Sequence, residues 1–555
     1  MRGREVFMHS LEAHGVTAIF GNPGTTENPV LDSLVEHPGI NYYVALHEGV
    51  AVGAAGFYAQ ASGKVGVANL HVAPGLGNAI GMLYGALKGG SPLVVTAGQQ
   101  DTRMRLRDPI LGHDLVAMAS PVTKWAVEPN HADELAPILR RAFKIAQEPP
   151  AGPVFVALPI NVMEQETANA PSTAGLLHTQ GAPDAAGLDK LARLLAESRN
   201  PAIVAGDDIA ASGAGAALVA LVERLGASVY VEYLRSRQPL PFDHANFRGR
   251  VPYEGAKIAA LFAPHDVVVL IGGRFFEEVW FDACDWLPEE TAVVQIESAP
   301  ARLAHNLSLD LGLLGAPPAV LSALATVLDR LWNDALEARA RQRQAALVAT
   351  RDEEASTFAR QLERVAGSTP MTALEAVATV AHGMPARGIL VDESITASGE
   401  VARAFALGDG GDYYAGRGGG IGQGLAGALG VAVAHPGRPV VALSGDGSAM
   451  YSIQALWTAA HHGLDIVFVI LSNREYRILK HNMDTYRDRF GIVTDKPYPH
   501  MNLAEPALGF TAMAQGMGLS AREVDSAAAL GAALAEATSA GGAWLIDVVV
   551  GGKGG

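Results

Sequence analysis

Ala442–Leu479 reads ALSGDGSAMYSIQALWTAAHHGLDIVFVILSNREYRIL, and this stretch decides the fold. Together with Val440 and Val441, its first residues predict a buried β-strand that turns at Gly445-Asp446-Gly447. A helical run follows from Ser452 to about His462, and Ile466–Leu471 predicts a second buried strand. Strand, glycine turn, helix and strand make a βαβ unit, which predicts an α/β domain with a parallel sheet.

Polar side chains follow both predicted strands at their carboxyl ends, where open α/β sheets bind ligands. Asn473 comes 27 residues after Asp446, about the length of one crossover unit, so both should lie at one sheet edge. Their side-chain oxygens and the backbone carbonyl of Glu475 suit Mg²⁺. Small residues before the helix leave N–H groups free for phosphates, namely Gly445, Gly447 and Ser448. The stretch therefore predicts a diphosphate–magnesium site, the alternative being an ordinary turn and a cap.

Length and composition limit the class of protein. A chain of 555 residues exceeds one core and should form three or four domains, and 62 glycines with 49% apolar residues suit buried parallel sheets. A net charge of −16 argues against nucleic acid or an anionic membrane as partner. The single cysteine, Cys284, fits a reducing compartment, and no apolar run reaches transmembrane length. We therefore expect a cytoplasmic enzyme.

Alternating helical and strand-like runs divide the chain into three α/β domains, expected at residues 1–165, 187–333 and 367–550. A Thr-, Ala- and Pro-rich linker separates the first two, and a charged helical connector (334–366) precedes the third. The predicted fold class is thus α/β, with three doubly wound parallel sheets.

Three segments of the first domain bring reactive side chains to predicted strand ends. The strand at Val44–Glu48 runs into Glu48, whose carboxylate has two alternative roles, in chemistry or in favouring the start of the next helix. Thr25 lies in the loop GNPGTTE (21–27), and His71 lies in LHVAPGLGN (70–78). Both loops should lie at the same sheet edge as Glu48. His113, on a loop after Gln100, is either catalytic or an exposed loop residue.

These motifs, Gly445-Asp446-Gly447 followed by Asn473 above all, resemble those of thiamine diphosphate (ThDP)-dependent 2-oxo acid decarboxylases. The order of three domains resembles their pyrimidine, middle and diphosphate domains. Among them, the benzoylformate decarboxylases share VTAGQQ (95–100) and similar loops around Thr25 and His71. Ser472 departs from the family, which usually has an asparagine there.

The resemblance implies roles for individual residues. Glu48 would hydrogen-bond the cofactor aminopyrimidine and promote its imino form, and Thr25 and His71 would transfer protons. His113 would face the cofactor, and Mg²⁺ would be held by Asp446, Asn473 and Glu475. The expected cofactor-binding residues are Pro23, Asn78, Ile395, Ser398, Gly419, Ile421, Gly445, Asp446, Gly447, Ser448, Asn473, Glu475, Tyr476 and Ile478.

The implied activity is ThDP- and Mg²⁺-dependent, non-oxidative decarboxylation of a 2-oxo acid to an aldehyde and CO₂. The implied assembly is a homodimer or homotetramer with active sites at subunit interfaces. Val279 stands where these enzymes carry a second histidine, and Ala415 and Asn482 stand where they carry phenylalanines. With Arg417 as a possible anion clamp, a smaller or more acidic substrate is as well supported as benzoylformate.

Three other functions stay open at this point. An acetolactate synthase-like carboligase and a flavin-dependent oxidase share the fold, although VAGDDI (204–209) lacks the GxGxxG pattern and disfavours a flavin. A non-catalytic relative is disfavoured because the chain keeps Glu48 and Asp446.

Overall fold

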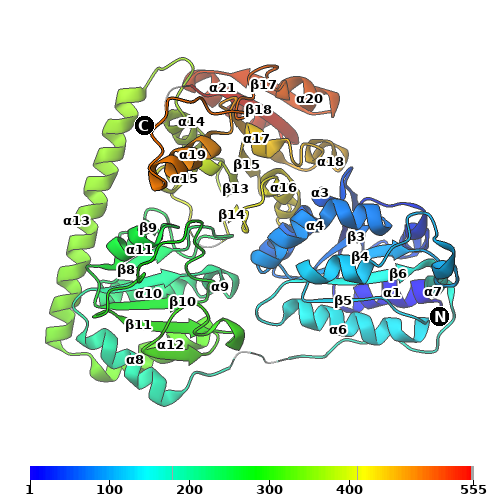
Figure 1. Ribbon diagram of the computed structural model, residues 1–555, viewed down its shortest axis with the longest axis horizontal. Helices are drawn as coiled ribbons and strands as arrows, with labels where there is room; N and C mark the ends of the chain where they lie inside the picture. Colours follow the sequence, from blue (N-terminus) through cyan, green and yellow to red (C-terminus); the bar gives the residue numbers. More distant parts are fainter. Residues whose placement is uncertain (178, 180, 409–410, 552–555) are drawn as a thin grey trace. The chain divides into compact units, whose positions relative to one another are not determined.

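The computed structural model contains three six-stranded parallel sheets with flanking helices, which confirms the predicted α/β class (Figure 1). It describes residues 1–177, 179, 181–408 and 411–551. The chain forms two compact units: the first comprises Met1–Leu177, Val365–Glu400 and Ala415–Gly555, the second His178–Arg364 and Val401–Tyr414. Within the described ranges, every helix is too short or too polar to cross a membrane.

The first sheet has the strand order β2-β1-β3-β4-β6-β5. Its strands are β1 (Ala18–Gly21), β2 (Asn41–Val44), β3 (Gly66–Leu70), β4 (Leu93–Gln99), β5 (Trp125–Val127) and β6 (Pro153–Pro159). Helices α1 (Gly3–Ala13) and α6 (Leu135–Gln147) pack on one face, and α3 (Glu48–Ser62) and α4 (Val72–Lys88) on the other (Figure 1). The remaining helices are α2 (Asn28–Ser33), α5 (Leu115–Ala119) and α7 (Ile160–Glu164).

The second sheet has the order β12-β11-β10-β7-β8-β9. Its strands are β7 (Pro201–Ala205), β8 (Ser228–Val231), β9 (Phe247–Arg250), β10 (Val267–Ile271), β11 (Ala292–Glu297) and β12 (Leu311–Leu314). Its helices are α8 (Ala185–Glu197), α9 (Asp207–Ala211), α10 (Gly215–Leu225), α11 (Gly255–Phe262) and α12 (Pro317–Leu331), followed by the long α13 (Asp334–Val365).

The third sheet has the order β14-β13-β15-β16-β18-β17. Its strands are β13 (Ile389–Glu393), β14 (Tyr413–Ala415), β15 (Val440–Gly445), β16 (Ile466–Ser472), β17 (Ser520–Val524) and β18 (Ala543–Val549). Its helices are α14 (Ala373–His382), α15 (Ser398–Ala404), α16 (Gln423–Ala434), α17 (Asp446–Ala449), α18 (Ala455–His461), α19 (Arg477–Arg489), α20 (Phe510–Gly516) and α21 (Ala527–Ala540).

Helices α3 and α16 pack tightly against each other within the first unit. Small residues allow the contact: a Cβ added at Gly430 would lie 2.0 Å from the carbonyl oxygen of Ala54, and one at Gly427 would lie 2.6 Å from Phe57. Helix α3 begins at Glu48, and α16 follows the glycine-rich loop 416–422. The contact between the two helices therefore helps to hold Glu48 and this loop in place.

The structure differs from the sequence prediction in three respects. The segment 70–78, expected as a strand-end loop, is mostly helical, because α4 begins at Val72, two residues after the end of β3 at Leu70. The turn expected at Gly445-Asp446-Gly447 is the start of α17, which begins at Asp446 directly after β15. Sequence analysis also missed β18 and the edge strands β5, β9, β12, β14 and β17. An edge strand pairs on one side only and is short, so it lacks the continuous apolar run that marks a central strand of a parallel sheet.

Candidate active site

A pocket with about 590 Å³ of open space lies at the carboxyl ends of β13, β15 and β16. Most of the predicted cofactor residues line it: Ile395, Ile421, Gly445, Asp446, Gly447, Ser448, Asn473, Glu475, Tyr476 and Ile478. Its position at the carboxyl ends of parallel strands is where open α/β sheets bind ligands. The pocket brings together the segments after two neighbouring strands, as the spacing of Asp446 and Asn473 predicts.

Asp446 joins the ends of β15 and β16. Its Oδ1 accepts a hydrogen bond from the Gly447 N–H at 2.7 Å, and its Oδ2 accepts one from the Arg474 N–H at 2.6 Å. Burial raises the pKa of Asp446, and these two N–H donors oppose the rise. Carboxylate oxygens have about four lone-pair positions, so two remain for a cation.

The segment after β16 presents further oxygen and aromatic groups to the pocket. The Asn473 Oδ1 accepts from the Glu475 N–H at 3.0 Å. Burial would raise the pKa of the Glu475 carboxyl, but hydrogen bonds from Lys480 and Arg477 hold it below its usual value. The Tyr476 ring packs so close to Gly447 that an added Cβ would lie 2.6 Å from it. The side chain of Glu475 is thus occupied by cations, which leaves its backbone carbonyl for a metal.

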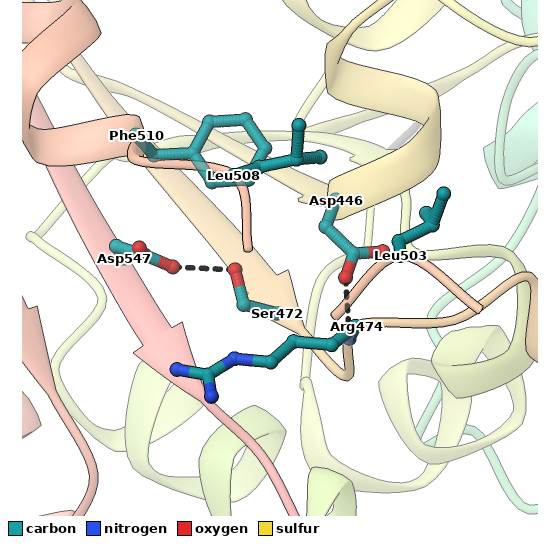
Figure 2. Close-up of a pocket in the computed structure, with 7 residues that line it drawn as sticks. All are labelled: Asp446, Ser472, Arg474, Leu503, Leu508, Phe510 and Asp547. Atoms are coloured by element: carbon teal, nitrogen blue, oxygen red, sulfur yellow. Dashed lines mark hydrogen bonds between the residues drawn. The ribbon is translucent and has the colours of Figure 1, made fainter. Parts of the chain in front are cut away.

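A smaller pocket adjoins the same strand ends (Figure 2). Here the Ser472 hydroxyl donates to the Asp547 carboxylate on β18, while Asp446 accepts from Arg474. Burial raises the pKa of Asp547 to about 6. Ser472, which stands where the family usually has an asparagine, therefore has a buried hydrogen-bond partner on the neighbouring strand.

Glu393, at the end of β13, holds the glycine loop before α16. Its Oε1 accepts from the N–H groups of Gly422 and Gln423 at 2.8 and 2.9 Å, and its Oε2 from Gly424 at 3.0 Å. Burial raises the pKa of Glu393 to about 7, against the effect of these donors. The three bonds anchor the segment that carries Ile421 into the pocket.

Three of the cofactor-binding residues predicted on the third domain have the following environments. Ile395 lines the pocket at φ +50°, a strained conformation for a β-branched residue, which marks a functional position in many sites. The Ser398 hydroxyl donates to the Ile395 carbonyl at 2.7 Å. Gly419 is exposed at φ +75°, which glycine adopts without strain.

Glu48 is 5% exposed and is held by two asparagines of the first domain. Asn22 Nδ2 donates to Oε1 at 3.1 Å, and Asn78 Nδ2 donates to Oε2 at 3.0 Å. The capping bond of α3 is made by His47, whose Nδ1 accepts from the Gly49 N–H at 3.0 Å. A capping role for the Glu48 side chain is therefore unnecessary, and its carboxylate is oriented by other groups.

His71 pairs with a carboxylate that sequence analysis missed. Its Nδ1 lies 2.7 Å from Oε2 of Glu27, whose side chain has no exposed surface. Glu27 also accepts from the N–H groups of Gly24 and Gly98, each at 2.8 Å, and from the Thr26 hydroxyl at 2.9 Å. These contacts hold the Glu27 carboxylate in place, and its contact with Nδ1 fixes the orientation of the His71 imidazole.

The other predicted residues of the first domain are more accessible. Thr25, at the start of a 3₁₀ turn, and His113, on its loop, are exposed, and Pro23 is half-buried. Val72, next to His71, is fully buried at φ +40°, a strained conformation for a β-branched residue.

The positions at which the chain departs from the family also have defined environments. Val279 is 65% exposed on the loop after β10, and Ala415 is buried at the end of β14. Arg417 is buried, with its backbone carbonyl accepting from Gln423 Nε2 at 2.9 Å.

Sequence reasoning missed Asn22, Glu27, Glu393 and Asp547. Three of these follow directly from position: Asn22 and Glu27 belong to the same strand-end segment as Thr25, and Glu393 ends a buried strand. A polar residue at the carboxyl end of a central parallel strand can be recognised in a sequence as a candidate site residue. Asp547 lies inside β18, two residues before its end, on a strand that was not predicted.

Three family models of known proteins match three successive parts of this chain. Residues 1–118, 188–324 and 396–548 match the N-terminal TPP binding domain, the central domain and the C-terminal TPP binding domain of thiamine pyrophosphate enzymes. A benzoylformate decarboxylase of Pseudomonas aeruginosa is 33% identical over 546 residues, covering 97% of both chains. A catabolic acetolactate synthase of Raoultella terrigena is 27% identical over 557 residues, covering 99% of this chain and 95% of that one.

Solved structures agree with the sequence matches. The thiamine diphosphate-dependent 4-hydroxybenzoylformate decarboxylase of Rhodococcus jostii superposes with a TM-score of 0.86 at 28% identity, over 100% of both chains. A benzoylformate decarboxylase of Polynucleobacter necessarius gives a TM-score of 0.86 at 26% identity, over 99% of this chain and 98% of that one.

Proposed function

This chain belongs to the thiamine diphosphate-dependent enzymes, and on that premise we propose that it is a Mg²⁺-dependent, non-oxidative 2-oxo acid decarboxylase releasing an aldehyde and CO₂. The observation that carries the proposal is the pair of oriented carboxylates: Asp446 at the strand-end pocket and Glu48 between two asparagines. An enzyme of this class needs one to hold a metal and the other to act on the cofactor ring.

The pocket of the third sheet fits a diphosphate bound through Mg²⁺. Asp446 and Asn473 offer hard oxygen ligands, and the Glu475 backbone carbonyl supplies a third. Ile421 and Tyr476 would cover the cofactor, which when bound supplies the electron sink for loss of CO₂. Of the described residues, those lining this pocket all lie between Ala373 and Val550, so Glu48 is not among them.

We infer that Glu48 of the partner subunit supplies the catalytic carboxylate, in a homodimer or homotetramer with active sites at subunit interfaces. Asn22 and Asn78 donate to both Glu48 oxygens, so the carboxylate is held in one orientation while a lone pair on each oxygen stays available. Its task would be to exchange a proton with the aminopyrimidine ring.

His71 is the residue we assign to proton transfer at the substrate. The bond to Glu27 fixes Nδ1 as the donor to the carboxylate and leaves Nε2 to give or take a proton. Thr25, exposed beside this pair, offers a hydroxyl for the substrate carboxylate, and His113 is the second imidazole of the domain that we place near the substrate.

Acetolactate synthase relatives favour a carboligase as the second candidate. We propose a small or acidic 2-oxo acid, or benzoylformate, as substrate, because Ala415 and Asn482 replace aromatic lining. We place the enzyme in the cytoplasm because its one cysteine, Cys284, is a free thiol.

Product analysis tests the proposal. The protein loaded with ThDP and Mg²⁺ is supplied with aromatic, aliphatic and dicarboxylic 2-oxo acids, and CO₂ and organic products are measured. Aldehyde formed in equal amount to CO₂ is the expected result. A hydroxyketone would establish the carboligase instead, hydrogen peroxide would establish an oxidase, and no turnover of any 2-oxo acid would refute the proposal.

A further inference from the structure

A cluster of two histidines and one carboxylate lies on α1, away from the residues assigned above. His9 and Glu12 are three positions apart on the exposed face of α1, and His37 follows the short 3₁₀ turn Leu34–Glu36. His37 Nδ1 lies 2.7 Å from Oε1 of Glu12, and His9 Nδ1 lies 3.1 Å from Oε2. One ligand atom from each of the three side chains lies within 4.8 Å of the others.

We propose that His9, Glu12 and His37 form a binding site for a divalent transition-metal cation, with Zn²⁺ as the best fit. Two imidazole nitrogens and a carboxylate oxygen are ligands that Zn²⁺ accepts, usually with water in the fourth position. Mg²⁺ prefers oxygen ligands, so the same site should discriminate against it. The proposal is independent of the function proposed above.

The distances fit a metal with little rearrangement. Zn²⁺ bonds of about 2.0–2.2 Å place neighbouring tetrahedral ligand atoms roughly 3.3–3.5 Å apart. The His37–Glu12 pair, at 2.7 Å, needs to open by about 0.6–0.8 Å, and the His9–Glu12 pair, at 3.1 Å, by about 0.2–0.4 Å. The imidazole rings lie edge-to-face with centroids 5.0 Å apart, so neither ring blocks the other.

Burial and charge also suit a metal site. The His37 side chain is 7% exposed, whereas those of Glu12 and His9 are 42% and 48% exposed, so the inner ligand is fixed and the outer side is open to water. The two Glu12 oxygens already lie between the imidazoles, Oε1 beside His37 and Oε2 beside His9, so the negative charge of the carboxylate faces the place of the cation. A bound metal would replace the protons that now lie between the carboxylate and the rings.

The fold offers a matched comparison for this cluster. In the same domain, His131 Nδ1 lies 3.1 Å from Asp133 Oδ2, and both side chains are about half exposed, as are those of His9 and Glu12. Within the described chain, no second imidazole joins the His131–Asp133 pair. If one histidine and one carboxylate sufficed, this pair would bind as well. The third ligand is what the proposal depends on.

Binding at this site would tie α1 to the segment before β2. That segment runs from His37 to β2, and β2 leads to His47 and Glu48. Because the ligands come from two elements that separate on unfolding, a metal that binds only the folded state should raise the melting temperature.

The experiment uses the full chain loaded with ThDP and Mg²⁺, stripped of transition metals and titrated with ZnCl₂ by calorimetry. One saturable Zn²⁺ per chain is expected, unaffected by excess MgCl₂. His9→Ala and Glu12→Gln, both at half-exposed positions, should each weaken binding at least about tenfold and remove the Zn²⁺-dependent rise in melting temperature. Their turnover without Zn²⁺ should equal that of the wild type.

His131→Ala is the control and should bind Zn²⁺ like the wild type. Absence of saturable binding would overturn the proposal. So would equal affinity in the wild type, His9→Ala and Glu12→Gln, because the metal would then be held elsewhere.

Discussion

Replacing Glu48 with glutamine tests the assignment of the catalytic carboxylate most directly. The change keeps the shape of the side chain but removes its charge and turns one oxygen into an NH₂ group. In the native chain both oxygens accept, from Asn22 at 3.1 Å and from Asn78 at 3.0 Å. One of the two asparagines would therefore face a donor in the variant.

The structural cost of this change should be small. An asparagine amide that faces the new NH₂ group can turn over and present its oxygen, which restores the pair. What is lost is the extra strength of hydrogen bonds to a charged group, about 1 kcal/mol in net stability. We therefore expect a folded protein that binds ThDP and Mg²⁺ nearly as well as the wild type.

The effect on reactivity should be much larger. Removing a positioned acid–base group slows the reaction by about 10²–10⁴-fold, which corresponds to roughly 3–5 kcal/mol in the activation barrier. The assay is exchange of the thiazolium C2 proton of bound ThDP, followed by NMR after quenching, alongside CO₂ release. Both rates should fall together in Glu48→Gln.

Glu27→Gln is the matched comparison, because Glu27 is also a buried carboxylate of the first domain. It contacts His71 rather than the groups around Glu48, so we expect CO₂ release to fall while C2 exchange continues. Wild-type C2 exchange in Glu48→Gln would refute the assignment. Loss of ThDP binding with a large fall in melting temperature would show instead that Glu48 is structural.

Three further predictions concern the metal, the helix contact and pH. Asp446→Ala should abolish Mg²⁺-dependent ThDP binding in equilibrium titrations while the chain stays folded, and retained binding would remove Asp446 from the metal site. Gly430→Ala should destabilise the protein by about 1–3 kcal/mol in thermal unfolding, since the new Cβ would meet the Ala54 carbonyl at 2.0 Å. Gly531→Ala, in a helix with open space around it, should stabilise the folded protein by up to about 1 kcal/mol. Equal effects of Gly430→Ala and Gly531→Ala on the unfolding free energy would contradict the packing argument. Burial raises the pKa of Glu297 from 4.5 to about 7, so its protonated form stabilises the native state at low pH and this stability is lost as pH rises through 7. Glu297→Gln should therefore gain stability relative to the wild type between pH 4.5 and 8, by up to about 3 kcal/mol, and a pH-independent difference would contradict it.

Much of the third domain follows from sequence patterns alone. Val440–Leu443 and Ile466–Leu471 are continuous apolar runs, and a parallel strand buried on both faces requires such a run. The distance from Asp446 to Asn473 fits one crossover unit, so topology places both side chains at one edge. The start of α17 was harder to predict, because glycine and aspartate favour turns and helix starts alike.

In the first domain, sequence patterns do not predict which side chains are hydrogen-bonded to one another. His71 was recognisable from its strand-end loop, but its bond to Glu27 joins residues 44 positions apart. Asn22 approaches Glu48 from the loop after β1, and Asn78 approaches it from helix α4, which follows β3. The spacing of these residues in the sequence does not show which of them are hydrogen-bonded to one another in the folded protein.

The sequence by itself determined the α/β class, the central strands other than β18, and the strand-end positions of Asp446, Asn473, Glu48 and His71. These follow from local periodicity and from the rule that parallel strands share their carboxyl edge. Only the tertiary structure decided which groups hold those side chains: Glu27 for His71, two asparagines for Glu48, and Asp547 for Ser472. Such partners are chosen by the paths of loops and by the need to satisfy buried polar atoms, and both depend on three-dimensional packing between segments distant in the chain.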